Sequence, residues 1–165
     1  EEIIYKGINK FKGLPHRQEE IYHGKSLICI NDSKATSFNA SIQALKSYKN
    51  IFWFLGGAPK KNDIINFKDV KKNIVQAYII GKNKKVFVKK LKNKIKYIKC
   101  DHLNEAFSKV IEDIKFFKRE TYNNKIPTLL FSPASASFDI YKNFEVRGEK
   151  FRKLFKNNKK KLINV

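Results

Sequence analysis

The sequence predicts an α/β domain of Rossmann-like type, in three layers, with helices on both faces of a mostly parallel sheet that has one antiparallel edge strand. Two observations support this fold class. Apolar residues dominate 51–55, 75–80 and 128–131 without alternating with polar ones, as they do in strands that are buried on both faces. Between these segments, apolar residues recur with the period of an α-helix.

The first elements lie between residues 20 and 57. Residues 20–23 and 26–31 form a hairpin-like pair around Gly24-Lys25. We expect Thr36 to cap the helix that follows. The apolar residues of this helix keep one face, at Phe38, Ile42, Leu45 and Tyr48. The strand at 51–55 then ends in Gly56-Gly57.

The later elements begin with a strand at 75–80 that ends at Gly81 and a short strand at 95–98. Asp101 is a good N-cap for the clearest helix of the chain. Its apolar residues follow a 3.6-residue period, at Leu103, Ala106, Phe107, Val110, Ile111, Ile114 and Phe117. After the strand at 128–131, a last helix carries Tyr141, Phe144, Phe151, Leu154 and Phe155.

The chain divides into three parts. Residues 1–15 resemble the end of a preceding unit and a linker, because Gly13-Leu14-Pro15 breaks a short amphipathic stretch. Residues 16–155 form the domain, and residues 156–165 are expected to be a basic, solvated tail. Met is absent from all 165 residues, including the first position, so we expect the chain to be a piece of a longer protein.

Several classes of protein are disfavoured by the composition. No run of about 18 apolar residues is present, so no membrane span is expected. The first residues lack the basic and apolar regions of a signal peptide. Cys29 and Cys100 have no metal-ligand spacing and lie in apolar runs, as small buried thiols do. These features fit a reducing cytoplasm.

A formal charge of +21 raises the possibility of a basic nucleic-acid-binding module. The excess is nearly all Lys, spread along the chain among Asn and Ile, and Arg occurs only at Arg17, Arg119, Arg147 and Arg152. A bias toward A and T codons would produce the same composition without any partner. Aromatic residues are also not interleaved with the basic ones as base-stacking platforms require. We therefore expect no nucleic acid partner.

Three polar loops each follow the carboxyl end of a predicted strand, at residues 31–36, 56–61 and 132–139. Ligands of open parallel sheets bind beyond those ends. Lys34 and Lys60 supply charge, while Thr36 and Ser137 supply hydroxyl donors and are expected to precede helix N-termini with free N–H groups. Gly56-Gly57 would let the backbone approach a ligand closely. The loops predict one site for a small dicarboxylate.

Simpler interpretations of each loop stay open. Asp32 would serve equally as a helix cap, and residues 132–137 as a plain helix start. The glycine pair is often only a turn, and Lys60 beside Lys61 is often solvated surface. The sequence has no G-x-x-x-x-G-K-[ST] phosphate loop and no G-x-G-x-x-G. No nucleophile–base pair, carboxylate dyad or clustered histidines is evident, so we expect no catalytic residue and no metal site in this domain alone.

Five motifs occur in order at natural spacings. They are Gly13-Leu14-Pro15-His16-Arg17, Asn31-Asp32-Ser33-Lys34-Ala35-Thr36, Gly56-Gly57 with Lys60, Ser132-Pro133-Ala134 through Ser137-Phe138-Asp139, and Lys142-Asn143-Phe144-Glu145-x-Arg147-Gly148. Over residues 11–155 they resemble the third domain of the Mur ligases that add D-glutamate to UDP-N-acetylmuramoyl-L-alanine (the MurD branch). The sister Mur ligases and folylpolyglutamate synthase share the fold but differ in these loops.

The resemblance implies the last domain of a cytoplasmic, monomeric enzyme of peptidoglycan synthesis, with no membrane partner. In this family a first domain holds the UDP-sugar peptide. A central domain, to which residues 1–15 would belong, holds most of the ATP and Mg²⁺ and carries a carbamylated lysine. ATP converts the L-alanine carboxylate to an acyl phosphate, which the D-glutamate amine attacks.

The resemblance also implies a role for particular side chains. Thr36 and Lys60 would hold one D-glutamate carboxylate, and Ser137, with Phe138 and the backbone near Phe144, would hold the other. Arg17, Asp32 and Lys34 would face the nucleotide, with Asp32 at the ribose and the two cations toward the phosphates.

This chain departs from the usual family pattern at three positions. Pro59-Lys60-Lys61 stands where Asp-Lys-Gly usually follows the glycine pair, so Lys61 is an alternative to Lys60 as the ligand. Ser135 replaces a common cysteine, and Ser37 replaces a common asparagine. Neither of the last two positions is a proposed ligand.

Overall fold

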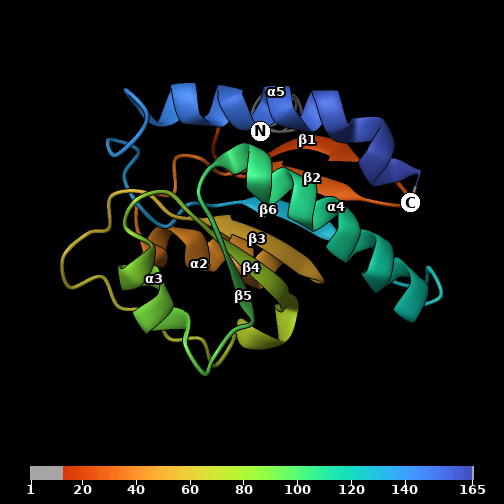
Figure 1. Ribbon diagram of the computed structural model, residues 1–165, viewed down its shortest axis with the longest axis horizontal. Coiled ribbons are helices and arrows are strands. Elements are labelled where there is room, and N and C mark those ends of the chain that lie inside the picture. Colours follow the sequence, from red (N-terminus) through yellow and green to blue (C-terminus); the bar gives the residue numbers. More distant parts are fainter. Residues whose placement is uncertain (1–12, 165) are drawn as a thin grey trace, which may run out of the picture.

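The computed structural model describes residues 13–164 and contains one six-stranded sheet with the strand order β1-β2-β6-β3-β4-β5 (Figure 1). Most of the predicted linker, residues 1–12, lies outside the described residues, as does Val165. The elements are β1 Glu19–His23, β2 Ile28–Asn31, α2 Phe38–Ser47, β3 Ile51–Leu55, the 3₁₀ helix η1 Lys71–Asn73, β4 Ile74–Ile80, α3 Lys84–Leu91, β5 Tyr97–Cys100, α4 Leu103–Glu120, β6 Thr128–Phe131 and α5 Phe144–Ile163.

The sheet is parallel except at one edge. There β1 pairs with β2 in antiparallel register, with His23 opposite Ile28. The other four pairings, β2 with β6, β6 with β3, β3 with β4 and β4 with β5, are parallel. The predicted mostly parallel sheet with one antiparallel edge strand is therefore confirmed.

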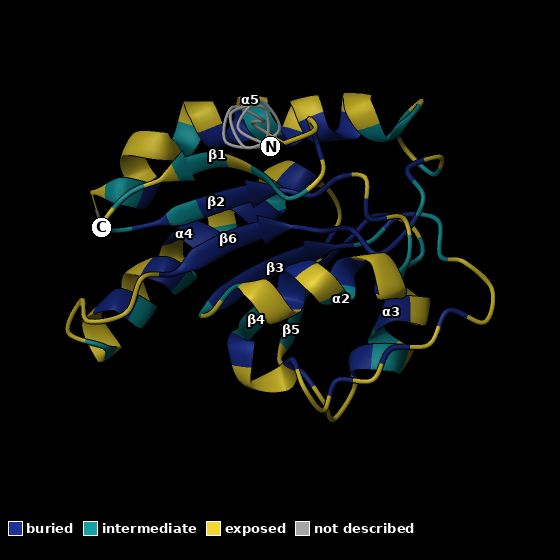
Figure 2. Cartoon of the chain, turned by 180° about the vertical axis from the view of Figure 1, so that it is seen from behind, coloured by how far each residue is buried: buried dark blue, intermediate teal, exposed yellow. Residues whose placement is uncertain are grey.

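Helices cover both faces of the sheet, α4 and α5 on one and α2 and α3 on the other (Figures 1 and 2). The alternation along β3 shows the two sides. Phe52 and Phe54 pack in the core under α4 and α5, whereas Trp53 packs with residues of α2 and α3. Because every residue of β3 is buried, this strand reads as a continuous apolar run. The three-layer α/β prediction is confirmed.

Several predicted boundaries are wrong, and at two helices the residue next to the predicted one forms the N-cap. Ser37, not Thr36, caps α2, since its side chain accepts from the N–H of Ala40. His102, not Asp101, caps α4 by accepting from the N–H of Glu105. The fifth strand occupies 97–100 rather than 95–98. The sequence pattern missed α3, because only Phe87 and Leu91 of its eight residues are buried.

The last helix differs most from its prediction. No helix begins after Ser137. Instead α5 begins at Phe144, where the Asn143 side chain accepts from the N–H of Val146. It also continues to Ile163 through most of the predicted tail, because Leu162 is fully buried in the core under α4 and α5. Among the helices of residues 13–164, none has the length and apolar character needed to cross a bilayer.

Candidate functional site

The three predicted loops lie at one edge of the sheet, as expected. They follow β2, β6 and β3, which are adjacent parallel strands, so their carboxyl ends meet. Backbone hydrogen bonds join the second and third loops. The N–H of Gly56 donates to the carbonyl of Pro133 at 2.9 Å, and Ala58 and Ala136 exchange two bonds of 2.9 and 3.1 Å. The loops are therefore one connected structure.

The glycine pair is needed for this connection. A Cβ on Gly56 would lie 2.0 Å from the carbonyl oxygen of Ile80 in β4. A Cβ on Gly57 would lie 2.4 Å from both the carbonyl oxygen of Ala136 and the hydroxyl of Ser135. Both glycines have φ between 129° and 140°, which side chains rarely adopt. They let the loop pack against its protein neighbours.

Asp32 is buried and joins the loop after β2 to two other segments. Its Oδ2 accepts from the Ser132 hydroxyl at 2.6 Å, and its Oδ1 accepts from the N–H of Gln18 at 3.1 Å. Burial raises the pKa of Asp32 to about 6, although both hydrogen bonds and the charge of Arg17 lower it. The carboxyl group thus holds the loop together and titrates near neutral pH. Asp32 is therefore not the helix cap that it could have been, because its two oxygens accept from Gln18 and Ser132 instead.

The three residues expected at the nucleotide share one groove. Arg17, Asp32 and Lys34 line a depression of about 230 Å³ together with Gln18, Ala35, Ala40 and Gln43. The N–H of Lys34 donates to the carbonyl of His16 at 2.9 Å, which fixes the two loops relative to each other. Arg17 and Lys34 are exposed, so both cations are available to a phosphate group.

The five residues expected at the D-glutamate are less closely assembled. Thr36 and Lys60 are exposed, Ser137 is 2% exposed, and Phe138 is 76% exposed. No hydrogen bond or ion pair joins Thr36, Lys60 and Ser137 within the described part of the chain. The sheet topology places them at the same edge, after β2, β3 and β6 respectively.

Phe144 connects the two groups of predicted residues. It is the first residue of α5, and its carbonyl accepts from the Ser33 hydroxyl at 2.7 Å. The ammonium of Lys34 lies 5.2 Å from the centre of the Phe144 ring, a cation–π distance. A residue expected beside D-glutamate and one expected beside the nucleotide are therefore in contact.

Arg147, for which the sequence predicts no role, holds the loops of the site together. It is 3% exposed, and its guanidinium donates from Nε to the hydroxyl of Ser33 at 3.1 Å and from Nη2 to the Ser33 carbonyl at 2.7 Å. A Cβ on Gly57 would lie 3.2 Å from its Nη1. Burial lowers the pKa of Arg147 to about 10, although the negative charge of Asp139 raises it. Arg147 thus touches or faces all three loops. Its rarity as one of four arginines was the available signal.

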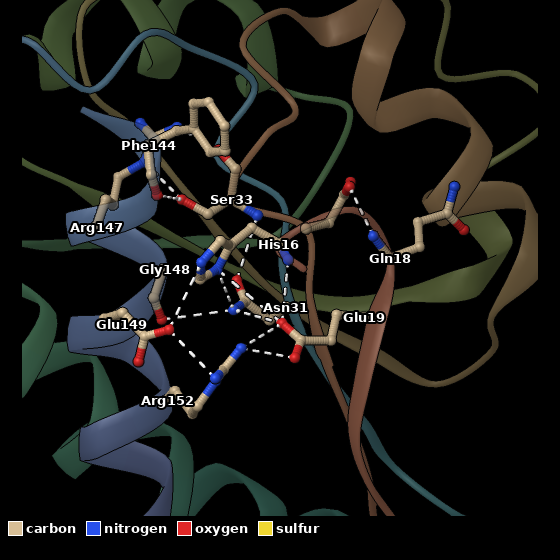
Figure 3. Close-up of polar contacts among 11 residues, drawn as sticks. His16, Gln18, Glu19, Asn31, Ser33, Phe144, Arg147, Gly148, Glu149 and Arg152 are labelled. Carbon is tan, nitrogen blue, oxygen red and sulfur yellow. Dashed lines mark hydrogen bonds and ion pairs between the residues drawn. The ribbon is translucent and has the colours of Figure 1, made fainter. Parts of the chain in front are cut away.

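His16 fastens the segment before β1 to α5 (Figure 3). It is 5% exposed, with a φ of 61°, and its Nδ1 accepts from the Asn31 amide at 2.9 Å. Its Nε2 lies 3.6 Å from the Glu149 carboxylate. Gly148 is required beside it, since a Cβ there would lie 2.2 Å from His16 Nδ1. Arg17, the next residue, is thereby held at the groove.

A charged pair reinforces this junction. Arg152 of α5 donates to both oxygens of Glu19 in β1, at 2.6 and 2.8 Å (Figure 3). Burial alone would raise the pKa of Glu19, but hydrogen bonds from the His16 N–H and Arg152 lower it overall. Polar contacts therefore link β1, the segment just before it and α5, next to Arg17 of the groove.

Comparison with known proteins identifies relatives of this chain. No protein-family model matches the chain. The chain is 40% identical over 152 residues to a UDP-N-acetylmuramoylalanine–D-glutamate ligase of Wolbachia sp. subsp. Brugia malayi, covering 92% of this chain and 29% of that protein. Proteins of the same name from Rickettsia felis and Rhodopseudomonas palustris are 36% and 35% identical, covering 94% and 93% of this chain and 33% and 32% of theirs.

The chain thus spans about a third of the length of the curated relatives it matches. The similarity includes almost every described residue and all three loops. The chain belongs to the UDP-N-acetylmuramoylalanine–D-glutamate ligase family, as a homologue of one part of those enzymes.

Proposed function

We propose that this chain is the C-terminal, D-glutamate-binding domain of an ATP-dependent ligase that adds D-glutamate to UDP-N-acetylmuramoyl-L-alanine in peptidoglycan precursor synthesis. One observation carries the proposal. In a chain 35–40% identical to such ligases, Arg17, Asp32 and Lys34 line one groove at the sheet edge where Thr36, Lys60 and Ser137 also lie. A cytoplasmic location and a monomeric state are part of the same proposal.

In the proposed reaction, the L-alanine carboxylate of the UDP-sugar substrate takes the γ-phosphoryl group of ATP. The amine of D-glutamate then attacks the acyl phosphate, and phosphate leaves as the amide bond forms. This domain would contribute positioning, because fixing both carboxylates of D-glutamate aims its amine. Thr36 and Lys60 would hold one carboxylate, and Ser137 with Phe138 and Phe144 the other.

The groove is suited to part of a nucleotide. Arg17 and Lys34 offer two exposed cations for phosphate oxygens, and Asp32 offers an acceptor for a ribose hydroxyl. Mg²⁺ prefers oxygen ligands from carboxylates. Within residues 13–164, no group of three His, Cys, Asp or Glu side chains is placed to hold a metal ion. We therefore propose that ATP and Mg²⁺ are held mainly by other parts of the enzyme.

A ligation assay with the complete enzyme tests this function. UDP-N-acetylmuramoyl-L-alanine, ATP and Mg²⁺ are supplied with D-glutamate, L-glutamate, L-lysine or meso-diaminopimelate, and amide product and ADP are measured. We expect product with D-glutamate only. Product with a basic or diamino acid instead would assign the chain to a sister Mur ligase, and product with none would contradict the ligase proposal.

A further inference from the structure

The loop after β3 is held to α2 by a carboxylate from its far end. Asp63 is 9% exposed, and its Oδ2 accepts from the backbone N–H of Phe38 at 2.6 Å. Phe38 is the first residue of α2, so its N–H has no partner inside the helix. A negative charge is also favoured at the positive end of a helix dipole. Asp63 therefore supplies a second, long-range cap beside the local cap formed by Ser37.

Contacts made by Lys90 and by the residues after Asp63 also hold the loop at this position. The ammonium of Lys90 in α3 donates to the carbonyl oxygen of Asp63. The same ammonium lies 5.3 Å from the centre of the Phe38 ring. The next residues, Ile65 and Phe67, are buried in the core under α2 and α3. Asp63 is thus the point at which the loop rejoins the packed body of the domain.

Lys60 lies on a short span between two anchors. On one side, Ala58 is bridged to Ala136. On the other side, Asp63 is bonded to Phe38. The residues between, 59–62, have no strand or helix, and Lys60 and Lys61 are both exposed. These two contacts therefore bound the segment that carries Lys60.

From this geometry we infer that Asp63 is a positioning residue for the amino acid substrate, acting through Lys60. By docking the loop on the first N–H of α2, it brings Lys60 to the helix end that Thr36 immediately precedes. An ammonium and a hydroxyl from two loops then converge on one carboxylate. The inference rests on the proposed function, in which Thr36 and Lys60 share a D-glutamate carboxylate.

The tether itself is tested on this chain without any substrate. Amide hydrogen exchange is compared for the native chain, Asp63→Ala and Asp69→Ala. Asp69 is a matched control because it is an exposed aspartate six residues on, with no hydrogen bond or ion pair among the described residues. We expect Asp63→Ala to speed exchange at Phe38 and across 60–66, and to leave Ala58 and 132–138 unchanged. Exchange equal to that of Asp69→Ala would overturn the inference.

The functional role is tested by a double-mutant cycle in the complete ligase. Lys60→Ala and Asp63→Ala should each raise the KM for D-glutamate, Asp63→Ala by a factor on the order of 10, with little change in the KM for ATP. If Asp63 acts through Lys60, the double variant should be no worse than Lys60→Ala alone. Asp63→Asn, which keeps an acceptor oxygen, should recover part of the loss.

The outcomes separate the two claims. If Lys60→Ala raises the KM but Asp63→Ala does not, or if the two effects multiply independently, the positioning role is wrong while the proposed function stands. If Lys60→Ala leaves the KM for D-glutamate unchanged, the proposed role of Lys60 fails, and the role of Asp63 in substrate positioning fails with it.

Discussion

The guanidinium of Arg147 donates to both the hydroxyl and the carbonyl oxygen of Ser33, at 3.1 and 2.7 Å. Ser33 lies between Asp32 and Lys34, two of the three proposed nucleotide residues. Its hydroxyl also donates to the carbonyl of Phe144, a proposed D-glutamate residue. The first turn of α5 therefore fixes the loop on which both proposed subsites depend.

Arg147→Met should destabilise the chain. The substitution removes two hydrogen bonds from a charged donor, one to the Ser33 hydroxyl and one to its carbonyl oxygen, but it also removes the cost of burying a charge. We expect the free energy of unfolding to fall by about 2 kcal/mol, measured by urea denaturation. Arg119→Met, at an exposed position of α4, is the control and should change it little. Equal values for the two variants would show that the buried contacts contribute nothing.

Gly57→Ala should be more damaging than Gly13→Ala. Both glycines have positive φ, 140° and 79°, but among the described residues only the new Cβ at Gly57 would meet neighbours, at 2.4 Å. We expect Gly13→Ala to cost about 1 kcal/mol from backbone strain and Gly57→Ala at least about 2 kcal/mol more from overlap. Urea denaturation measures both. Similar losses would mean that the loop yields easily and that its contact with residues 135–136 is loose.

The pH dependence of stability should report the burial of Asp32. Its pKa is raised from 3.8 to about 6 in the folded chain, so between these values the folded state holds a proton that the unfolded state has lost. Raising the pH through this window should lower the free energy of unfolding by up to about 3 kcal/mol from this group alone. Asp32→Asn should abolish that loss.

A comparison between variants isolates the contribution of Asp32 to the pH dependence of stability. The lowered pKa of Glu19 acts in the opposite direction, since its stabilisation is lost as pH falls, but it is common to all variants. Asp69→Asn, at an exposed aspartate, should follow the native curve. A difference between Asp32→Asn and native chain that does not change between pH 4 and 6.5 would contradict the assignment.

The strands and loops were predictable because their signals are local. Residues 51–55 are apolar throughout and residues 128–131 are apolar after Thr128, and β3 and β6 have those bounds. The polar loops follow these strands directly, so a parallel sheet was enough to place them at one edge. The predicted site residues could thus be gathered to one region from sequence, although their roles came from a resemblance.

The remaining features depend on partners distant in sequence. Phe38 and Asp63 are 25 residues apart, and Arg147 and Ser33 are 114 apart, so no local pattern reveals either contact. Residues 132–137 look like a helix start, yet the backbone there pairs with Ala58 instead. The tail was expected to be solvated because it is rich in Lys, yet most of it is helical, with Leu162 buried in the core and Ile163 packed against it.

The chain by itself should neither hydrolyse ATP nor form the amide. It contains no phosphate loop, and the described residues offer no carboxylate cluster for Mg²⁺. Phosphate release is measured with purified chain, ATP and Mg²⁺, with D-glutamate and UDP-N-acetylmuramoyl-L-alanine added. Turnover that is reduced by Arg17→Ala and Lys34→Ala would show that the catalytic apparatus lies within this domain.

The most direct test of D-glutamate binding compares two adjacent lysines in the complete ligase. A charge-assisted hydrogen bond to a carboxylate is worth about 1.5–3 kcal/mol, so Lys60→Ala should raise the KM for D-glutamate roughly 10- to 150-fold. The KM for ATP should change little, because the groove proposed for the nucleotide is lined by Arg17 and Lys34 and not by Lys60. Lys61→Ala, at the next exposed position, should be nearly silent. If Lys61→Ala raises the KM and Lys60→Ala leaves it at the native value, Pro59 has shifted the loop by one residue. If neither variant changes it, this loop does not bind D-glutamate.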